Sequence, residues 1–178
     1  YAVAYTPMMA RAAIAEGKIV FIHALEGAET LLNTREDTLF WAQRGVAMIN
    51  PVHMLDNEFG GAYIPPGISG IYNNPCGLLR EIFSPEKRRG LTPKGRLALI
   101  NMAVSGIMID LAHMSPDSRE GAMAIVRNLE VPPMVSHGTL KAIRNEERGL
   151  TDEEVQELYA LGGVFGVIGS PNGDPYKP

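Results

Sequence analysis

The sequence contains one cysteine and no long apolar run, and its charge is not concentrated in one sign. Cys76 has no second thiol to pair with, so an internal disulfide is excluded and the redox compartment stays open. We interpret Cys76 as structural. No run approaches the roughly 20 apolar residues that a membrane span needs. The chain opens on Tyr1 without the charged-then-apolar order of a signal peptide, so its localisation is unknown.

Basic patches and phosphate-binding loops are also missing. The formal net charge is −4, with acidic and basic residues interspersed, which argues against a nucleic-acid backbone as partner. No G-x-G-x-x-G or G-x-x-x-x-G-K-[ST] motif follows an apolar segment. We therefore expect a small-molecule ligand, and we leave a homodimer open.

What the sequence does contain is an alternation of apolar segments and helix-start signals. With 178 residues, 46% of them apolar, it can bury one core, and we treat 1–178 as a single domain. Near-continuous apolar runs of this kind are typical of parallel strands covered on both faces. The predicted strands are 18–25, 45–53, 106–113, 132–137 and 162–169. Capping residues followed by proline or acidic residues predict helices that begin after Thr34, Thr92, Ser115 and Thr151.

This order predicts an α/β fold with a parallel sheet. An open doubly wound sheet and a closed (β/α)8 barrel both fit, and the missing phosphate motifs favour the barrel. A complete barrel needs eight parallel strands and only five are predicted here. We therefore predict a partial TIM-like barrel with about three βα units outside this sequence. The Gly/Pro/Asn-rich segment 54–90 is predicted to be a long loop insertion after a strand. The stretch alone is expected to be inactive and poorly soluble, because sheet edges would be uncovered.

Polar residues gather at one end of the predicted strands. Glu26, His53, His113 and His137 each follow or close an apolar run, and the carboxyl ends of parallel strands form the active face of a β/α barrel. One histidine at a strand end is usually structural, but here three of the chain's four are so placed. A carboxylate with imidazoles suits one or two zinc ions, which activate water and polarise a carbonyl. The pattern predicts a metal-dependent hydrolase, and we interpret His23 as structural.

The order and spacing of these residues resemble those of a known family. The shared features are short motifs after successive strands: Glu26-Gly27, His53, Gly-Leu-Thr-Pro-Lys-Gly at 90–95, Ile-Asp-Leu-Ala-His-Met-Ser at 109–115, Val-Ser-His at 135–137 and Arg144-Asn145. Over about 18–169 the chain is similar to the membrane (renal) dipeptidase family, peptidase M19. The resemblance implies a TIM-like barrel that hydrolyses dipeptides with zinc.

The resemblance also implies roles for individual residues. Glu26 would bridge two zinc ions, and His113 and His137 would complete the coordination of one of them. His53 would be the catalytic residue that contacts the substrate and stabilises the oxyanion. Arg144 would bind the terminal carboxylate of the substrate. Asp110 either orients a ligand or is a buried structural carboxylate.

Two parts of the family pattern have no counterpart in this sequence. The His-x-Asp pair of the first strand, which holds the other zinc, and a late acidic residue are both missing. Two alternatives to a dipeptidase therefore stay open: an amidohydrolase acting on another small amide or lactam, and a catalytically inactive barrel relative.

Overall fold

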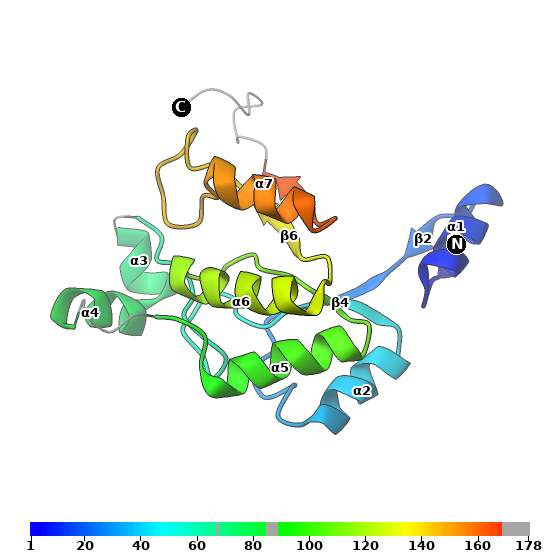
Figure 1. Cartoon of the computed structure of the whole chain (residues 1–178), viewed down its shortest axis with the longest axis horizontal. Coiled ribbons are helices and arrows are strands. Elements are labelled where there is room, and N and C mark those ends of the chain that lie inside the picture. Colours follow the sequence, from blue (N-terminus) through cyan, green and yellow to red (C-terminus); the bar gives the residue numbers. More distant parts are fainter. Residues whose placement is uncertain (67, 85–88, 169–178) are drawn as a thin grey trace.

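A computed structural model describes residues 1–66, 68–84 and 89–168, which form alternating strands and helices (Figure 1). The strands are β1 (Ala2–Val3), β2 (Val20–Phe21), β3 (His23–Glu26), β4 (Val46–Asn50), β5 (Met108–Ile109), β6 (Met134–Gly138) and β7 (Val164–Val167). The helices are α1 (Pro7–Ala15), α2 (Arg35–Gln43), α3 (Ile68–Asn73), α4 (Pro75–Phe83), α5 (Pro93–Val104), α6 (Pro116–Leu129) and α7 (Asp152–Ala160). No helix in these ranges is long and apolar enough to cross a bilayer.

The paired strands are all parallel, which confirms the predicted α/β class. β1 pairs with β2, β3–β4–β5 form one sheet in sequence order, and β6 pairs with β7. A single parallel bridge between Asp110 and Met134 joins the end of β5 to the start of β6. From β3 to β7 each strand therefore lies beside the next along the chain, and the carboxyl ends of these strands lie on the same side.

The predicted helices begin where the capping signals placed them. The hydroxyls of Thr34, Thr92, Ser115 and Thr151 each accept a hydrogen bond from a backbone amide in the first turn of α2, α5, α6 and α7. Each such bond satisfies one of the amides that a helix start leaves without a partner.

The strands differ from their predicted bounds. The run 18–25 is divided into β2 and β3 at Ile22, and the run 106–113 contributes only Met108–Ile109 to a strand. The segment 54–90, expected as a loop, contains α3 and α4 within its described residues. The N-terminal unit of β1 and α1 was not predicted, and it extends away from the rest of the molecule (Figure 1).

The core lies between the sheet and the layer of α2, α5 and α6. Ile49 and Ile109 from the strands and Leu99, Met102 and Val126 from the helices have at most 2% of their surface exposed. Burying such side chains contributes about 1.5–3 kcal/mol each. The helices therefore fix the strands from one side and leave their carboxyl ends free to carry polar residues.

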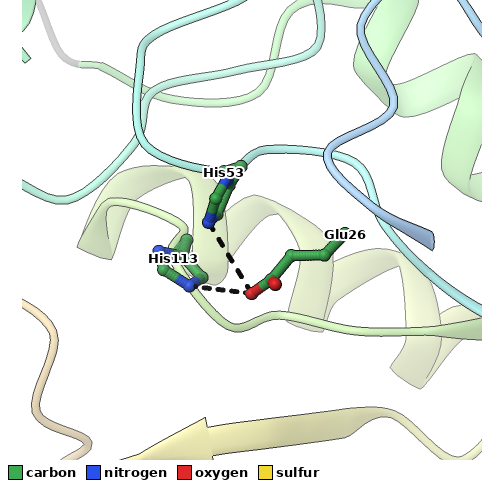
Figure 2. A group of neighbouring side chains, drawn as sticks. All are labelled: Glu26, His53 and His113. Carbon is green, nitrogen blue, oxygen red and sulfur yellow. Dashed lines mark ion pairs between the residues drawn. The ribbon is translucent and has the colours of Figure 1, made fainter. Parts of the chain in front are cut away.

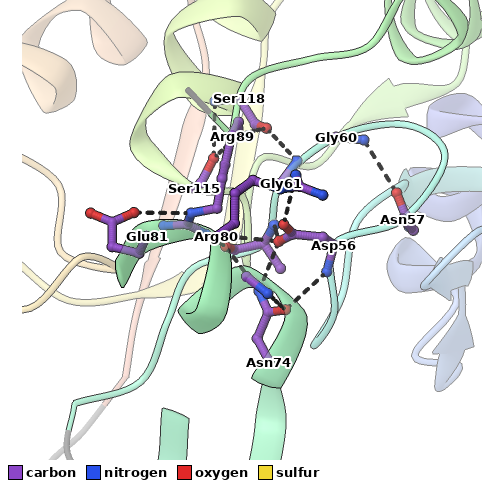
Figure 3. Close-up of polar contacts among 12 residues, drawn as sticks. Asp56, Asn57, Gly60, Gly61, Asn74, Arg80, Glu81, Arg89, Ser115 and Ser118 are labelled. Carbon is purple, nitrogen blue, oxygen red and sulfur yellow. Dashed lines mark hydrogen bonds and ion pairs between the residues drawn. The ribbon is translucent and has the colours of Figure 1, made fainter. Parts of the chain in front are cut away.

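A buried arginine organises the long segment between β4 and α5 (Figure 3). The guanidinium of Arg89 contacts Glu147 and the backbone oxygen of Ala62, and it lies 3.7 Å from Asp56. Its backbone oxygen accepts hydrogen bonds from Ser115 at 2.5 Å and Ser118 at 2.9 Å. Burial raises the pKa of Glu147, and Arg89 opposes that rise. Arg89 thus ties this segment to the start of α6 and to the loop before α7.

Gly95 allows α5 to approach the segment after β4 more closely than any other residue would. A Cβ at this position would lie 1.9 Å from the backbone oxygen of Phe59, whereas at Gly90 the nearest atom would be 3.6 Å away. We expect Gly95→Ala to lower the free energy of unfolding by about 1–3 kcal/mol and Gly90→Ala to leave it nearly unchanged. Thermal denaturation of both variants tests this, and equal melting temperatures would contradict it.

Candidate metal centre

Four side chains meet at the carboxyl ends of β3 to β6. Glu26 is the last residue of β3, and His137 lies in β6. His53 and His113 lie in the segments that follow β4 and β5. Glu26 Oε1 is 3.2 Å from His113 Nε2, 3.3 Å from His137 Nε2 and 3.7 Å from His53 Nε2. Figure 2 shows Glu26, His53 and His113 pointing toward one another. One carboxylate oxygen therefore faces three imidazole nitrogens.

His113 is held in an unusual backbone conformation. Its φ is 65°, in the left-handed region that residues with a Cβ rarely adopt. Its backbone oxygen accepts a hydrogen bond from the Tyr63 amide at 2.8 Å, and Asn50 Nδ2 donates to the Ala112 oxygen at 2.5 Å. Strain of this kind persists only where the surrounding structure enforces it, and it concentrates at functional sites.

The environment of His113 keeps its ring neutral. Burial, reinforced by the charges of Arg148, His53 and His137, lowers the pKa of His113 to about 3. A neutral imidazole has a nitrogen lone pair to offer to a metal ion. The Nε2 atom lies 2.8 Å from His137 Nε2, while Nδ1 is buried without a hydrogen-bond partner.

These residues fit a metal ion by their chemistry. Glu26, His53 and His113 form a group whose ligand atoms all lie within 4.8 Å of one another, and His137 contacts two of them. Carboxylate oxygen and imidazole nitrogen together suit zinc and other first-row metals. Glu26 and His137 are partly exposed, so the cluster opens to solvent on one side.

Two arginines near the cluster have different surroundings. Arg144 has 62% of its side chain exposed and lies 3.6 Å from Glu146. Arg148 donates to the His137 backbone oxygen at 3.4 Å and lies 5.4 Å from the centre of the Tyr63 ring. Its Nε is buried with no hydrogen-bond partner. Sequence reasoning missed Arg148, because both arginines follow His137 in the same loop and composition does not distinguish them.

The remaining residues singled out from the sequence lie around the cluster or away from it. Asp110 is buried directly after β5, with 1% of its surface exposed. His23 lies in β3 with its ring edge-to-face against Tyr5, at 6.3 Å between centroids. The exposed side chain of Cys76 lies in α4.

One cavity in the described part of the chain lies away from this cluster. It has a volume of about 520 Å³ and is lined by Asp56, Arg80 and Arg89 among others. These charged groups pair with one another, Arg80 at 3.3 Å and Arg89 at 3.7 Å from Asp56. None of the four converging side chains lines the cavity, so we assign it no ligand.

Comparison with known proteins decides the family. The sequence model of the membrane dipeptidase family, peptidase family M19, matches residues 1–172. The chain belongs to this family. The resemblance inferred from the strand-end motifs is therefore confirmed, and the fold agrees with that of its members.

Curated relatives of the M19 chain are distant and longer. An uncharacterized dipeptidase of Schizosaccharomyces pombe is 27% identical over 151 residues, which cover 85% of this chain and 32% of that protein. An uncharacterized protein of Acinetobacter calcoaceticus is 25% identical over 153 residues, covering 86% of this chain and 43% of that protein. The chain spans less than half the length of these relatives.

Solved structures of bacterial peptidases share the fold. The probable dipeptidase PvdM of Pseudomonas aeruginosa is 27% identical with a TM-score of 0.76, covering 96% of this chain and 39% of that chain. A metallo peptidase of Rhodobacter sphaeroides, liganded with a phosphinate mimic of the dipeptide L-Ala-D-Ala, is 23% identical with a TM-score of 0.70. That likeness covers 97% of this chain and 45% of the other.

The lowered pKa of His113 predicts how stability depends on pH in the metal-free protein. Between the unfolded value of 6.5 and the folded value of about 3, the unfolded chain binds a proton that the folded chain does not. The free energy of unfolding should therefore fall as the pH drops through this window, by up to about 1.4 kcal/mol per pH unit. Urea titrations between pH 7 and 5 measure the slope. His113→Gln should make it shallower, and an unchanged slope would contradict a neutral buried His113.

Proposed function

We propose that the protein containing this chain is a zinc-dependent dipeptidase. The observation that carries the proposal is the convergence of Glu26 Oε1 with the Nε2 atoms of His53, His113 and His137 within 3.7 Å. Membership of the M19 family supports peptide-bond hydrolysis, and the Rhodobacter sphaeroides relative carries a dipeptide mimic. We propose a dipeptide, or a closely similar small molecule, as the substrate.

The same proposal includes the complete fold and the number of ions. The parallel strands from β3 to β7 would form one arc of a closed (β/α)8 barrel, to which sequence beyond these 178 residues contributes the remaining units. Glu26 would bridge two zinc ions in that complete barrel. The His-x-Asp pair that the family pattern assigns to the other ion would come from the same additional sequence.

Each residue of the cluster has a distinct role in this proposal. Glu26, His113 and His137 hold the metal, and His113 is suited to this because burial keeps it neutral. A bound zinc ion supplies Lewis-acid polarisation of the scissile carbonyl and activation of the attacking water. His53 is the most exposed of the three rings, with 37% of its side chain accessible. Its proposed role is to donate a hydrogen bond to the oxygen that becomes negatively charged, and so to act as the catalytic residue.

The terminal carboxylate of the substrate needs a cation beside the cluster. The family resemblance implied this role for Arg144, but we propose that Arg148 performs it. Arg148 contacts the backbone of His137, lies over Tyr63 and keeps one buried donor without a partner. An arginine fork is suited to a carboxylate because two N–H groups reach its two oxygens.

Metal content tests the cluster directly. We expect the purified full-length protein to contain zinc by elemental analysis, and His113→Ala and His137→Ala to lose at least one equivalent together with dipeptide hydrolysis. His23→Ala is the matched control, because His23 packs against Tyr5 instead of joining the cluster. A wild-type protein without metal and without hydrolysis would overturn the proposed function.

A pair of arginine variants tests the carboxylate site. We expect Arg148→Ala to lower kcat/KM for a dipeptide about 10- to 100-fold, since a charged hydrogen bond contributes ~1.5–3 kcal/mol. Arg144→Ala should change it less than threefold. The same dipeptide with its C-terminus amidated should be nearly insensitive to Arg148→Ala. If Arg144→Ala causes the larger loss, Arg144 is the carboxylate ligand, as the sequence pattern implied.

A further inference from the structure

A chain of hydrogen bonds leads from the metal cluster to a buried carboxylate. Asp110 Oδ1 accepts from the backbone amides of Ala112 at 3.0 Å and Ser136 at 2.9 Å. Asp110 Oδ2 lies 2.5 Å from Ser136 Oγ, which in turn lies 2.8 Å from His137 Nδ1. His137 Nε2 continues the chain to His113 Nε2 at 2.8 Å. The series therefore runs from Asp110 through Ser136 and His137 to His113.

The groups at the two ends of this hydrogen-bond series decide which atoms donate and which accept. An ionised carboxylate only accepts hydrogen bonds, so the Ser136 hydroxyl donates to Asp110 and has only acceptor capacity left for His137. At the other end, His113 Nδ1 is buried without a partner. A buried N–H without an acceptor is costly, so the proton of the neutral His113 ring sits on Nε2 and is donated to His137 Nε2. Both ends require His137 to carry its proton on Nδ1.

The local shape of β6 makes the contact possible. Ser136 and His137 are adjacent, and in a regular strand their side chains would point to opposite faces. The pairing of β6 with β7 changes register between Val135 and Gly138. Irregularities of this type re-aim side chains beside active sites. Here the irregularity lies at the two residues whose side chains meet.

We infer that Ser136 is a positioning residue: its hydroxyl donates to Asp110 and accepts a hydrogen bond from His137 Nδ1. This relay leaves His137 Nε2 unprotonated toward Glu26 and His113. The relay fixes both the tautomer and the ring orientation before any metal binds. Its importance for metal affinity rests on the proposed function, whereas the tautomer itself does not. Asp110, which the sequence left as either an orienting or a structural carboxylate, becomes the anchor of the relay.

The tautomer can be read from the ring-nitrogen chemical shifts of ¹⁵N-labelled full-length protein after the metal is removed by a chelator. Above the pH at which His137 protonates, we expect its proton on Nδ1. Ser136→Ala should weaken this preference, because only the His113 end of the series then orients the His137 ring. Asp110→Asn should reverse it, because the new amide N–H donates to Ser136 Oγ and Ser136 then donates to Nδ1. Ser136→Thr keeps the hydroxyl and should restore the wild-type tautomer.

Zinc affinity, measured by competition with a chromophoric chelator, gives the second readout. We expect Ser136→Ala and Asp110→Asn to weaken binding about 10- to 100-fold, as loss of a ligand's hydrogen-bond partner does elsewhere, and Ser136→Thr to bind like the wild type. Ser118→Ala is the matched control, because it removes another serine hydroxyl that, among the described residues, bonds only Gly61 and Arg89. It should change neither tautomer nor affinity.

The outcomes separate this inference from the proposed function. A wild-type His137 with its proton on Nε2, or a tautomer unchanged by both Ser136→Ala and Asp110→Asn, overturns the relay whatever the metal content. A correct tautomer with no zinc bound by the wild type leaves the relay standing and overturns the dipeptidase proposal. Altered tautomers with unchanged zinc affinity overturn the relay's part in metal binding.

Discussion

The parallel register of four consecutive strands is the constraint on which the site depends. Glu26 lies opposite Asn50 in the β3–β4 pair, and Asp110 bridges to Met134 between β5 and β6. Because all these strands point the same way, residues that lie far apart in the sequence arrive at one end of the sheet. A slip of one residue in any pair would turn the side chains of that strand to the other face. The buried apolar residues beneath, such as Ile49 and Ile109, make such a slip costly because they would lose their packing.

Sequence reasoning found the features that local chemistry dictates. Helices preceded by a capping residue and starting with proline or acidic residues begin as predicted, because a capping hydrogen bond is made within the first turn of the helix. The same signal was present and overlooked at Thr6-Pro7 and Asn74-Pro75, which begin α1 and α4. Strand limits were less predictable. The apolar run 45–53 ends as a strand at Asn50, whose side chain bonds the Ala112 backbone, a partner 62 residues away. No local pattern contains that information.

The sequence was sufficient to predict which residues converge in the site, but not which residues around them support it. Glu26, His53, His113 and His137 stood out because residue type and strand position coincided. Arg148 did not, because its place over Tyr63 depends on how the loop before α7 folds back. That fold-back is held in turn by Glu147, the neighbour of Arg148, which contacts Arg89 from the distant segment after β4. Ser136 was visible only as part of a Val-Ser-His motif, and its contact with both Asp110 and His137 requires the irregular register of β6.

The cluster also shows how stability and function oppose each other at this end of the sheet. His113 is buried in a left-handed backbone conformation with one ring nitrogen unpartnered, and each of these features lowers the stability of the folded chain. Glu26 places a negative charge against the neutral ring of His113, which offers it far less electrostatic stabilisation than a cation would. The electrostatic cost has one remedy. A divalent ion among Glu26 Oε1 and the ring nitrogens would supply the missing positive charge, bind the unprotonated Nε2 of His137 and displace the Nε2 proton of His113. The arrangement is therefore understandable as a preformed metal site, and it is poorly explained as a structural hydrogen-bond network.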